Sequence, residues 1–171
     1  NHYFTEKSIL SESVYQYHTM IREFLLTRAK ETISHESFLA LLRRAASLLD
    51  EDGQTEAAVS LLGEVSDWEG LVRLIMKQAP SMVEQGRTRP LEEWLNSLPQ
   101  EVLENNPWLL FWMGICNMTV SPSRSQRCFE EAYRKFRSQG DIAGIIHACW
   151  GMIHSIMNAT TDFSPLDRWI P

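Results

Sequence analysis

The sequence has 171 residues, of which 44% are hydrophobic and 22% are charged, and its net charge is −6. These values are typical of a soluble protein with one large domain, or with a small domain joined to part of another. The acidic balance argues against a direct contact with nucleic acid, because phosphate recognition needs clustered Lys and Arg.

Two further features indicate the compartment. The longest apolar run, residues 108–116, is much shorter than the ~20 residues that a helix needs to cross a bilayer. The three cysteines (Cys116, Cys128 and Cys149) fall on apolar helix faces, and an odd number of core cysteines fits a reducing compartment better than a disulfide framework. We therefore expect a cytoplasmic protein without membrane contact.

The N-terminal part is the only region with strand character. Residues 3–5 and 13–17 are rich in aromatic and β-branched side chains, and a polar, turn-like segment separates them. This pattern predicts a β-hairpin, followed by a helix over residues 18–30. The side chains expected to be buried in this helix are Ile21, Phe24 and Leu25. A strand pair that leads directly into such a helix is typical of the end of a winged-helix module.

Residues 41–75 predict three short helices in succession, because apolar residues recur at intervals of three and four. The expected buried positions are Leu41, Leu42, Ala45, Leu48 and Leu49, then Ala57, Ala58, Leu61, Leu62 and Val65, then Trp68, Leu71, Val72 and Ile75. Gly53 ends the first helix, because glycine adopts the left-handed conformation without a steric penalty. Ser66 and Glu69 have the spacing of a capping box before the third helix, which Pro80 either interrupts or separates from a fourth.

The C-terminal half continues with helices that have clear start and stop signals. Asn106-Pro107 and Ser121-Pro122 are each a cap residue followed by proline at the first helical position, whereas Gly140-Asp141 ends one helix and caps the next. The positions expected to be buried are Leu91, Trp94, Leu95 and Leu98, then Cys128, Phe129, Ala132, Tyr133 and Phe136, and finally Ile145, Ile146, Cys149, Trp150, Ile153 and Ile156. Ser164-Pro165 predicts the start of one more helix, so we expect the helical array to continue.

None of these helices can bury its apolar face alone, so they must stack. We predict an all-α protein whose antiparallel helical hairpins form an α-solenoid, with a small N-terminal β-hairpin that remains from a winged-helix domain. The expected domains are residues 1–33, the C-terminal part of the winged helix; residues 34–106, a helical linker; and residues 107–171, the start of tetratricopeptide-like repeats.

The helix pair over residues 107–139 has about the length of the ~34-residue tetratricopeptide unit. Gly114, Phe129 and Ala132 fall near the small and aromatic positions of that pattern. Asn117 stands where the pattern has an aromatic residue, so the match is partial.

Residues 15–26, 43–75 and 91–110 resemble the MalT-like bacterial transcription regulators, which are signal-transducing ATPases that commonly end in a LuxR-type DNA-binding domain. In the first segment the shared residues are Tyr15, Tyr17, His18, Arg22, Glu23, Phe24 and Leu25. The chain departs at Thr19, Met20 and Ile21, where the family usually has proline, leucine and phenylalanine. In the third segment the shared residues are Trp94, Leu95, Leu98, Pro99, Val102, Leu103, Pro107, Trp108 and Leu109.

The resemblance implies a regulatory, non-catalytic part of an ATP-dependent transcription regulator. Its nucleotide domain would lie upstream and its DNA-binding domain downstream, so DNA would be contacted only outside this sequence. The resting protein would hold ADP between the nucleotide and winged-helix domains, and effector binding to the repeats would allow ATP exchange and self-association. By position His18 would contact the ADP phosphate, beside the backbone N–H groups of a helix start. Alternatively, His18 caps its own helix or packs under the wing.

The sequence contains no GxxxxGK[ST], HExxH or CxxC motif. His147 and His154 share a helix face but lie about 10.5 Å apart along its axis, which is wider than the i,i+4 spacing of metal-binding pairs. Together with Gly144 and Gly151 they predict a close-packed helix contact or part of a groove wall. We therefore expect no enzymatic activity, no metal and no cofactor bound to this chain alone.

Trp108 and Trp112 lie one turn apart on a helix that is apolar almost all the way round. Their spacing is that of core residues, as it is for Trp68, Trp94 and Trp150. Of these five tryptophans, Trp108 and Trp112 are the best candidates to meet a small-molecule or protein effector, because aromatic residues dominate such contacts on solenoid surfaces. The alternative function is a stand-alone helical-repeat scaffold that binds a protein partner and has no nucleotide domain. The segment around His18 separates the two hypotheses, because a plain scaffold does not need a wing.

Overall fold

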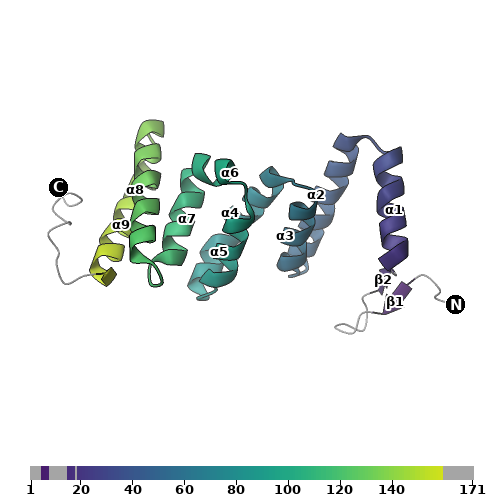
Figure 1. Ribbon diagram of the computed structural model, residues 1–171, viewed down its shortest axis with the longest axis horizontal. Coiled ribbons are helices and arrows are strands. Elements are labelled where there is room, and N and C mark those ends of the chain that lie inside the picture. The colour runs from purple at the N-terminus through teal and green to yellow at the C-terminus, as the bar shows by residue number, and fades with distance from the viewer. Residues whose placement is uncertain (1–4, 8–14, 18, 160–171) are drawn as a thin grey trace. The chain divides into compact units, whose positions relative to one another are not determined.

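The computed structural model describes residues 5–7, 15–17 and 19–159, which are helical apart from one pair of short strands (Figure 1). The elements are β1 (Thr5–Lys7), β2 (Tyr15–Tyr17), α1 (Thr19–Thr32), α2 (His35–Glu51), α3 (Thr55–Glu64), α4 (Trp68–Glu84), α5 (Thr88–Ser97), α6 (Gln100–Asn105), α7 (Pro107–Asn117), α8 (Pro122–Gln139) and α9 (Ile142–Ala159). Among the described residues, no helix is long and apolar enough to cross a membrane. The chain divides between Leu61 and Leu62 into two compact units.

In the first unit, β1 and β2 pair antiparallel, with Thr5 opposite Tyr17. They overlap the two segments predicted to be extended, and α1 follows at once. The prediction for the buried face of α1 was wrong in part: Phe24 and Leu25 are exposed, and Ile21 is only partly buried. The reason is that α1 packs against α2, so its apolar side chains on other faces stay open within the described residues.

The buried face of α2 also differs from the prediction. Phe38, Leu42, Ala46 and Asp50 form a buried row at intervals of four, whereas Leu41 and Leu48 are exposed. Apolar residues occupy more than one face of this helix, so periodicity alone allowed both orientations. Two residues outside the predicted set, Phe38 and Asp50, stabilise the observed orientation of α2. Phe38 is buried in the core, and the Asp50 carboxylate accepts a hydrogen bond from Thr55 Oγ1 (2.9 Å).

Two predicted helix ends are confirmed. Gly53 (φ 78°) and Gly140 (φ 71°) both adopt the left-handed conformation. The following residue closes each turn: Gln54 N donates to the Leu49 carbonyl (2.7 Å) and Asp141 N to the Phe136 carbonyl (3.0 Å). These contacts are those of the Schellman motif, which satisfies carbonyls at the end of a helix.

The predicted capping box before α4 is wrong. Ser66 ends α3 in the left-handed conformation (φ 56°), so it cannot also begin α4. Asp67 N donates to the Leu62 carbonyl (3.0 Å), and Asp67 Oδ1 accepts from Gly70 N (3.3 Å). Asp67 therefore joins the two helices, as the C″ residue of α3 and the N-cap of α4.

Pro80 neither interrupts α4 nor begins another helix, because α4 runs without a break through residue 84. Proline removes one backbone donor, but its ring faces solvent here. The apolar face continues past Pro80 with Ala79 and Met82, both buried, so packing of this face stabilises the helix.

In the second unit α4, α5 and α7 share a core, whose members include Leu71, Ile75, Leu91, Trp94, Leu95, Leu98 and Leu109.

Helices α7, α8 and α9 lie side by side and form the best-packed part of the chain (Figure 1). The predicted core positions Phe129, Ala132 and Phe136 of α8 are fully buried. In α9 the predicted face was largely wrong: the buried residues are Gly144, Ala148, Gly151, Met152, Ser155 and Ile156, whereas Ile146 and Trp150 are exposed. The small residues of α9 let it approach α8 closely, and Ile146 and Trp150 therefore lie on the exposed side of the helix.

Candidate ligand-binding groove

Two aromatic rings of α8 fill the space that glycines of the neighbouring helices leave open. A Cβ on Gly151 would contact the Phe129 ring, and one on Gly144 would contact the Phe136 ring. A Cβ on Gly114 of α7 would also meet Phe129, 2.7 Å from its Cε1 atom. The predicted close contact at Gly144 and Gly151 is therefore confirmed, and through Phe129 the contact extends to Gly114 of α7.

The two tryptophans predicted to meet an effector are half-buried on α7. The Trp108 ring packs edge-on against Phe136 (centroids 4.9 Å apart) and against His147 (5.4 Å). Trp112 packs against Phe111 (5.0 Å), and its Nε1 atom is buried without a hydrogen-bond partner among the described residues. Trp108 thus has a packing role between α7, α8 and α9, and a contact of either ring with an effector stays a prediction.

A groove of about 600 Å³ lies along α8, next to α6 and α7. Its lining residues are Glu104, Asn105, Leu110, Arg124, Arg127, Cys128, Glu130, Glu131, Arg134 and Lys135. The lining is strongly charged, with four basic and three acidic side chains. Helix α8 carries five basic and two acidic residues, a net charge of +3, whereas the whole chain has −6. The lining of the groove therefore has a net charge of +1, beside a basic helix of an acidic protein.

The four basic side chains of the groove differ in their ion-pair and hydrogen-bond partners. Arg134 Nη1 lies 3.1 Å from Glu131 Oε2, and Lys135 Nζ lies 3.9 Å from Glu131 Oε1. Both are pairs within one turn of α8, so they rearrange easily. Arg127 is exposed at the groove. Arg124, in contrast, is held by residues of another helix.

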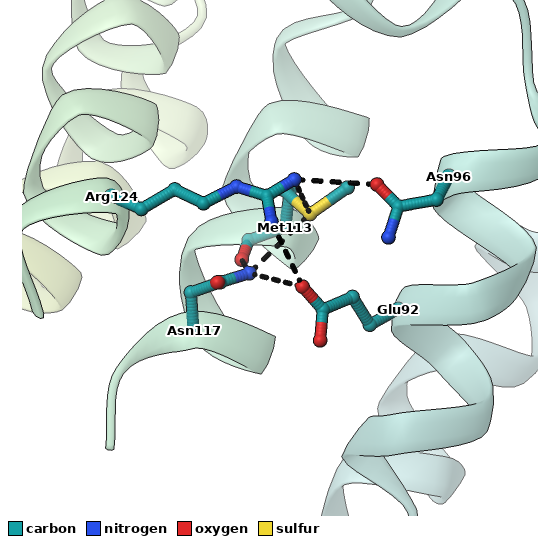
Figure 2. A network of polar contacts seen from close by, with 5 residues as sticks. All are labelled: Glu92, Asn96, Met113, Asn117 and Arg124. Carbon is teal, nitrogen blue, oxygen red and sulfur yellow. Dashed lines mark hydrogen bonds and ion pairs between the residues drawn. The ribbon is translucent and has the colours of Figure 1, made fainter. Parts of the chain in front are cut away.

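Figure 2 shows the polar network around Arg124, which connects α5, α7 and α8. Arg124 Nη1 donates to Glu92 Oε1 (3.2 Å), and its Nη2 donates to Asn96 Oδ1 (3.3 Å). The same Glu92 oxygen accepts from Asn117 Nδ2 (3.0 Å), which also donates to the Met113 carbonyl (3.0 Å). Asn117 is buried, so its amide needs these partners. Arg124 is therefore both a wall of the groove and part of a link to α5.

Glu92, Arg124 and Arg127 were not among the predicted site residues. The available signal was Asn117, a polar residue at a position where the tetratricopeptide pattern has an aromatic one. A buried amide needs partners, but the sequence does not say which helix supplies them. Glu92 is 25 residues away in the chain, and only the packing of α5 on α7 brings it close.

The three cysteines are free thiols. Burial, together with the negative charge of Glu92, raises the pKa of the Cys116 thiol to about 12. Burial also raises the pKa values of Cys128 and Cys149 above their ordinary value. All three are therefore protonated near neutral pH, which makes them poor nucleophiles.

His18, the predicted ADP contact, lies outside the described residues. Within those residues no cluster of three or more His, Cys, Asp or Glu could hold a metal ion. His147 and His154 are both exposed, and their rings pack against different tryptophans, Trp108 and Trp150.

Comparisons with protein-family models, with curated proteins and with solved structures returned no match for this chain.

Proposed function

We propose that this chain is a non-catalytic regulatory module of a MalT-like, ATP-dependent transcription regulator. In this proposal, an effector or partner binds to the helical repeats, and its binding is relayed to a nucleotide switch in another part of the same protein. The resemblance of residues 15–26, 43–75 and 91–110 names the family. The observation that carries the regulatory role is the charged groove on α8 whose wall residue Arg124 is also bonded to α5.

The groove favours a ligand that carries carboxylate or other anionic groups. Arg127 is exposed there, and Arg134 and Lys135 share a single carboxylate, Glu131, so positive charge is available to a ligand. Guanidinium groups bind carboxylates through paired, charge-assisted hydrogen bonds. Leu110 and Cys128 add an apolar part to the lining, which suits an acidic peptide or a small organic acid.

The relay follows from the double role of Arg124. An anionic ligand in the groove competes with Glu92 for the guanidinium group, which lies 3.2 Å from the Glu92 carboxylate in the free protein. A weaker Arg124–Glu92 contact would loosen the connection between α8 and α5. A ligand shifts an equilibrium only by its differential affinity for two states, and this exchange of partners supplies such a difference.

The test uses the full-length protein encoded by the gene that contains this sequence. The proposal expects a phosphate-loop motif upstream, a helix-turn-helix domain downstream, and ADP retained through purification. His18→Ala should release the ADP, whereas the control His35→Ala, at the exposed first residue of α2, should not. A full-length protein without a phosphate loop, or one that retains no nucleotide, would refute the proposal.

A stand-alone scaffold that binds a protein partner is the second candidate. The observation in its favour is that the groove and the Arg124 network are complete within residues 62–159 and need no nucleotide domain. This function predicts a short open reading frame and a groove that binds acidic peptides. Arg127→Glu should then abolish peptide binding without changing the helical content.

A further inference from the structure

Three side chains of alternating charge lie in one row of α8 along the groove. Arg127, Glu131 and Lys135 follow one another at intervals of four residues, so they share one face of the helix, and we call them the charged row. All three line the groove, together with the buried Leu110 of α7 and the partly buried Cys128. The order of the charged row is basic, acidic, basic, and successive members are about 6 Å apart along the helix axis.

The members of the charged row are available to a ligand. Arg127 has Glu131 one turn ahead of it, but it forms no ion pair among the described residues. Burial raises the pKa of the Cys128 thiol, whereas the positive charges of Arg124 and Arg127 act to lower it, so both guanidinium groups lie close to this thiol of the groove. Glu131 pairs with Lys135 only within α8 (3.9 Å), and such solvent-accessible pairs exchange partners easily.

A ligand with negative charges alone is a poor complement of the charged row. Glu131 lies between the two basic members, so an anionic group placed opposite it would be repelled. A ligand with the order acidic, basic, acidic meets each member with the opposite charge. Its own net charge of about −1 also complements the net charge of +1 of the groove lining.

An extended peptide presents charged side chains at the required spacing. Every second residue of an extended chain points to the same side, and these residues are about 6.6–6.8 Å apart, close to the step of the charged row. A helix with its side chains is about 10 Å wide, so a 12 Å length of helix would fill about 900 Å³. The groove offers about 600 Å³, which favours the thinner extended chain. A small organic acid without a cationic group would leave Glu131 unmatched.

We infer that the groove binds an extended peptide segment of a partner protein with the pattern acidic-x-basic-x-acidic, whose charged side chains face Arg127, Glu131 and Lys135. The inference rests on the proposed function in that it uses the same groove, and it narrows the ligand from an anionic group to a peptide of alternating charge. It holds for either candidate function.

Two labelled peptides of identical composition test the inference by fluorescence anisotropy with the 171-residue chain. One has the core Glu-Leu-Lys-Leu-Glu, whose charge order is the same in both directions. The other has the core Glu-Leu-Glu-Leu-Lys, which places two like charges opposite the charged row in either direction. We expect the first peptide to bind at least roughly fivefold more tightly, and the difference to shrink in high salt.

Charge reversal in the chain should change the preferred peptide in a defined way. Glu131→Lys makes the charged row basic throughout, so the preference should move to Glu-Leu-Glu-Leu-Glu. Lys135→Glu should move it to Glu-Leu-Lys-Leu-Lys. The matched control is Arg137→Glu, at an exposed position in the last turn of α8 that is not part of the groove lining, and it should leave the preference unchanged. Circular dichroism on each variant verifies that the helical content is retained.

The outcomes separate this inference from the proposed function. Equal affinity for the two peptides of identical composition, or no binding of either one, would overturn the inference. Tighter binding of Glu-Leu-Glu-Leu-Glu to the unchanged chain, or displacement by succinate as effective as that by unlabelled peptide, would overturn it too, but would leave the anionic ligand of the proposed function in place. A full-length protein without a phosphate loop would refute the proposed regulator and leave this inference intact.

Discussion

The close contact between α8 and α9 gives the sharpest test of the packing. Gly151→Ala adds one methyl group where the Phe129 ring already lies, and Phe129 is fully buried and also in close contact with Gly114. Because the ring is fully buried and closely packed, the added methyl group overpacks the core at a cost of about 1–3 kcal/mol. Alanine is the better helix former by about 1 kcal/mol, which offsets part of this cost.

We therefore expect Gly151→Ala to lower the free energy of unfolding by up to about 2 kcal/mol, and to be about 1–3 kcal/mol less stable than the control Gly63→Ala, which gains the same helix propensity. For a protein of this size the melting temperature should fall by up to about 8 °C. The measurement is urea unfolding followed by circular dichroism, with the melting temperature from calorimetry. The matched control is Gly63→Ala in α3, where an added Cβ meets no atom within 4 Å and the helix gains up to about 1 kcal/mol.

A double substitution identifies the cause. Phe129→Leu shortens the ring side chain, so combining it with Gly151→Ala should cost less than the sum of the two single effects, by at least about 0.5 kcal/mol. Strict additivity would mean that the methyl group and the ring do not meet. If Gly151→Ala were as stable as Gly63→Ala, the reasoning about close packing would be refuted.

Three further predictions concern a helix start, a buried thiol and the polar network. Asn106→Ala removes the acceptor for the first N–H groups of α7 and should cost about 1 kcal/mol in urea unfolding, whereas Asn105→Ala should change it by less than about 0.5 kcal/mol. Burial raises the pKa of Cys116 from 9.0 to about 12, so its contribution to stability is present below pH 9 and is lost as the pH rises toward 12. Cys116→Ala should therefore reduce the loss in the free energy of unfolding as the pH rises from 9 toward 12. An unchanged pH dependence would contradict the raised pKa of Cys116. Arg124→Met should cost less than about 1 kcal/mol, since the Arg124 side chain is 42% exposed in its pair with Glu92, and the cost should shrink in high salt.

Local signals in the sequence predicted where most of the C-terminal helices begin and end. Asn106 caps α7 through Oδ1, which accepts from Trp108 N (3.0 Å), and Gly140 ends α8 in the left-handed conformation. These features depend on a few neighbouring residues, so they could be read without knowledge of the fold. The exception at Ser66 shows the limit, because a serine can end one helix as well as begin the next.

The orientation of the helices was harder to predict. In α9 almost every position is apolar or small, so periodicity alone did not show which side faces the core. The observed choice depends on Phe129 and Phe136 of another helix, whose rings need the space at Gly151 and Gly144. The same holds for the groove, since Arg124 and Glu92 are 32 residues apart and meet only because α5 and α8 both pack near α7.

The sequence by itself determined the helical class of this protein, the ends of most of its helices, and the positions of glycine and capping residues. These are properties of short segments, where backbone sterics and local hydrogen bonds decide the outcome. Only the tertiary structure decided which face of α2 and α9 is buried, where the positive charge of α8 gathers, and that Arg124 joins the groove to α5. Such features depend on the fit between side chains that are distant in the chain, and a single segment carries no information about its partner.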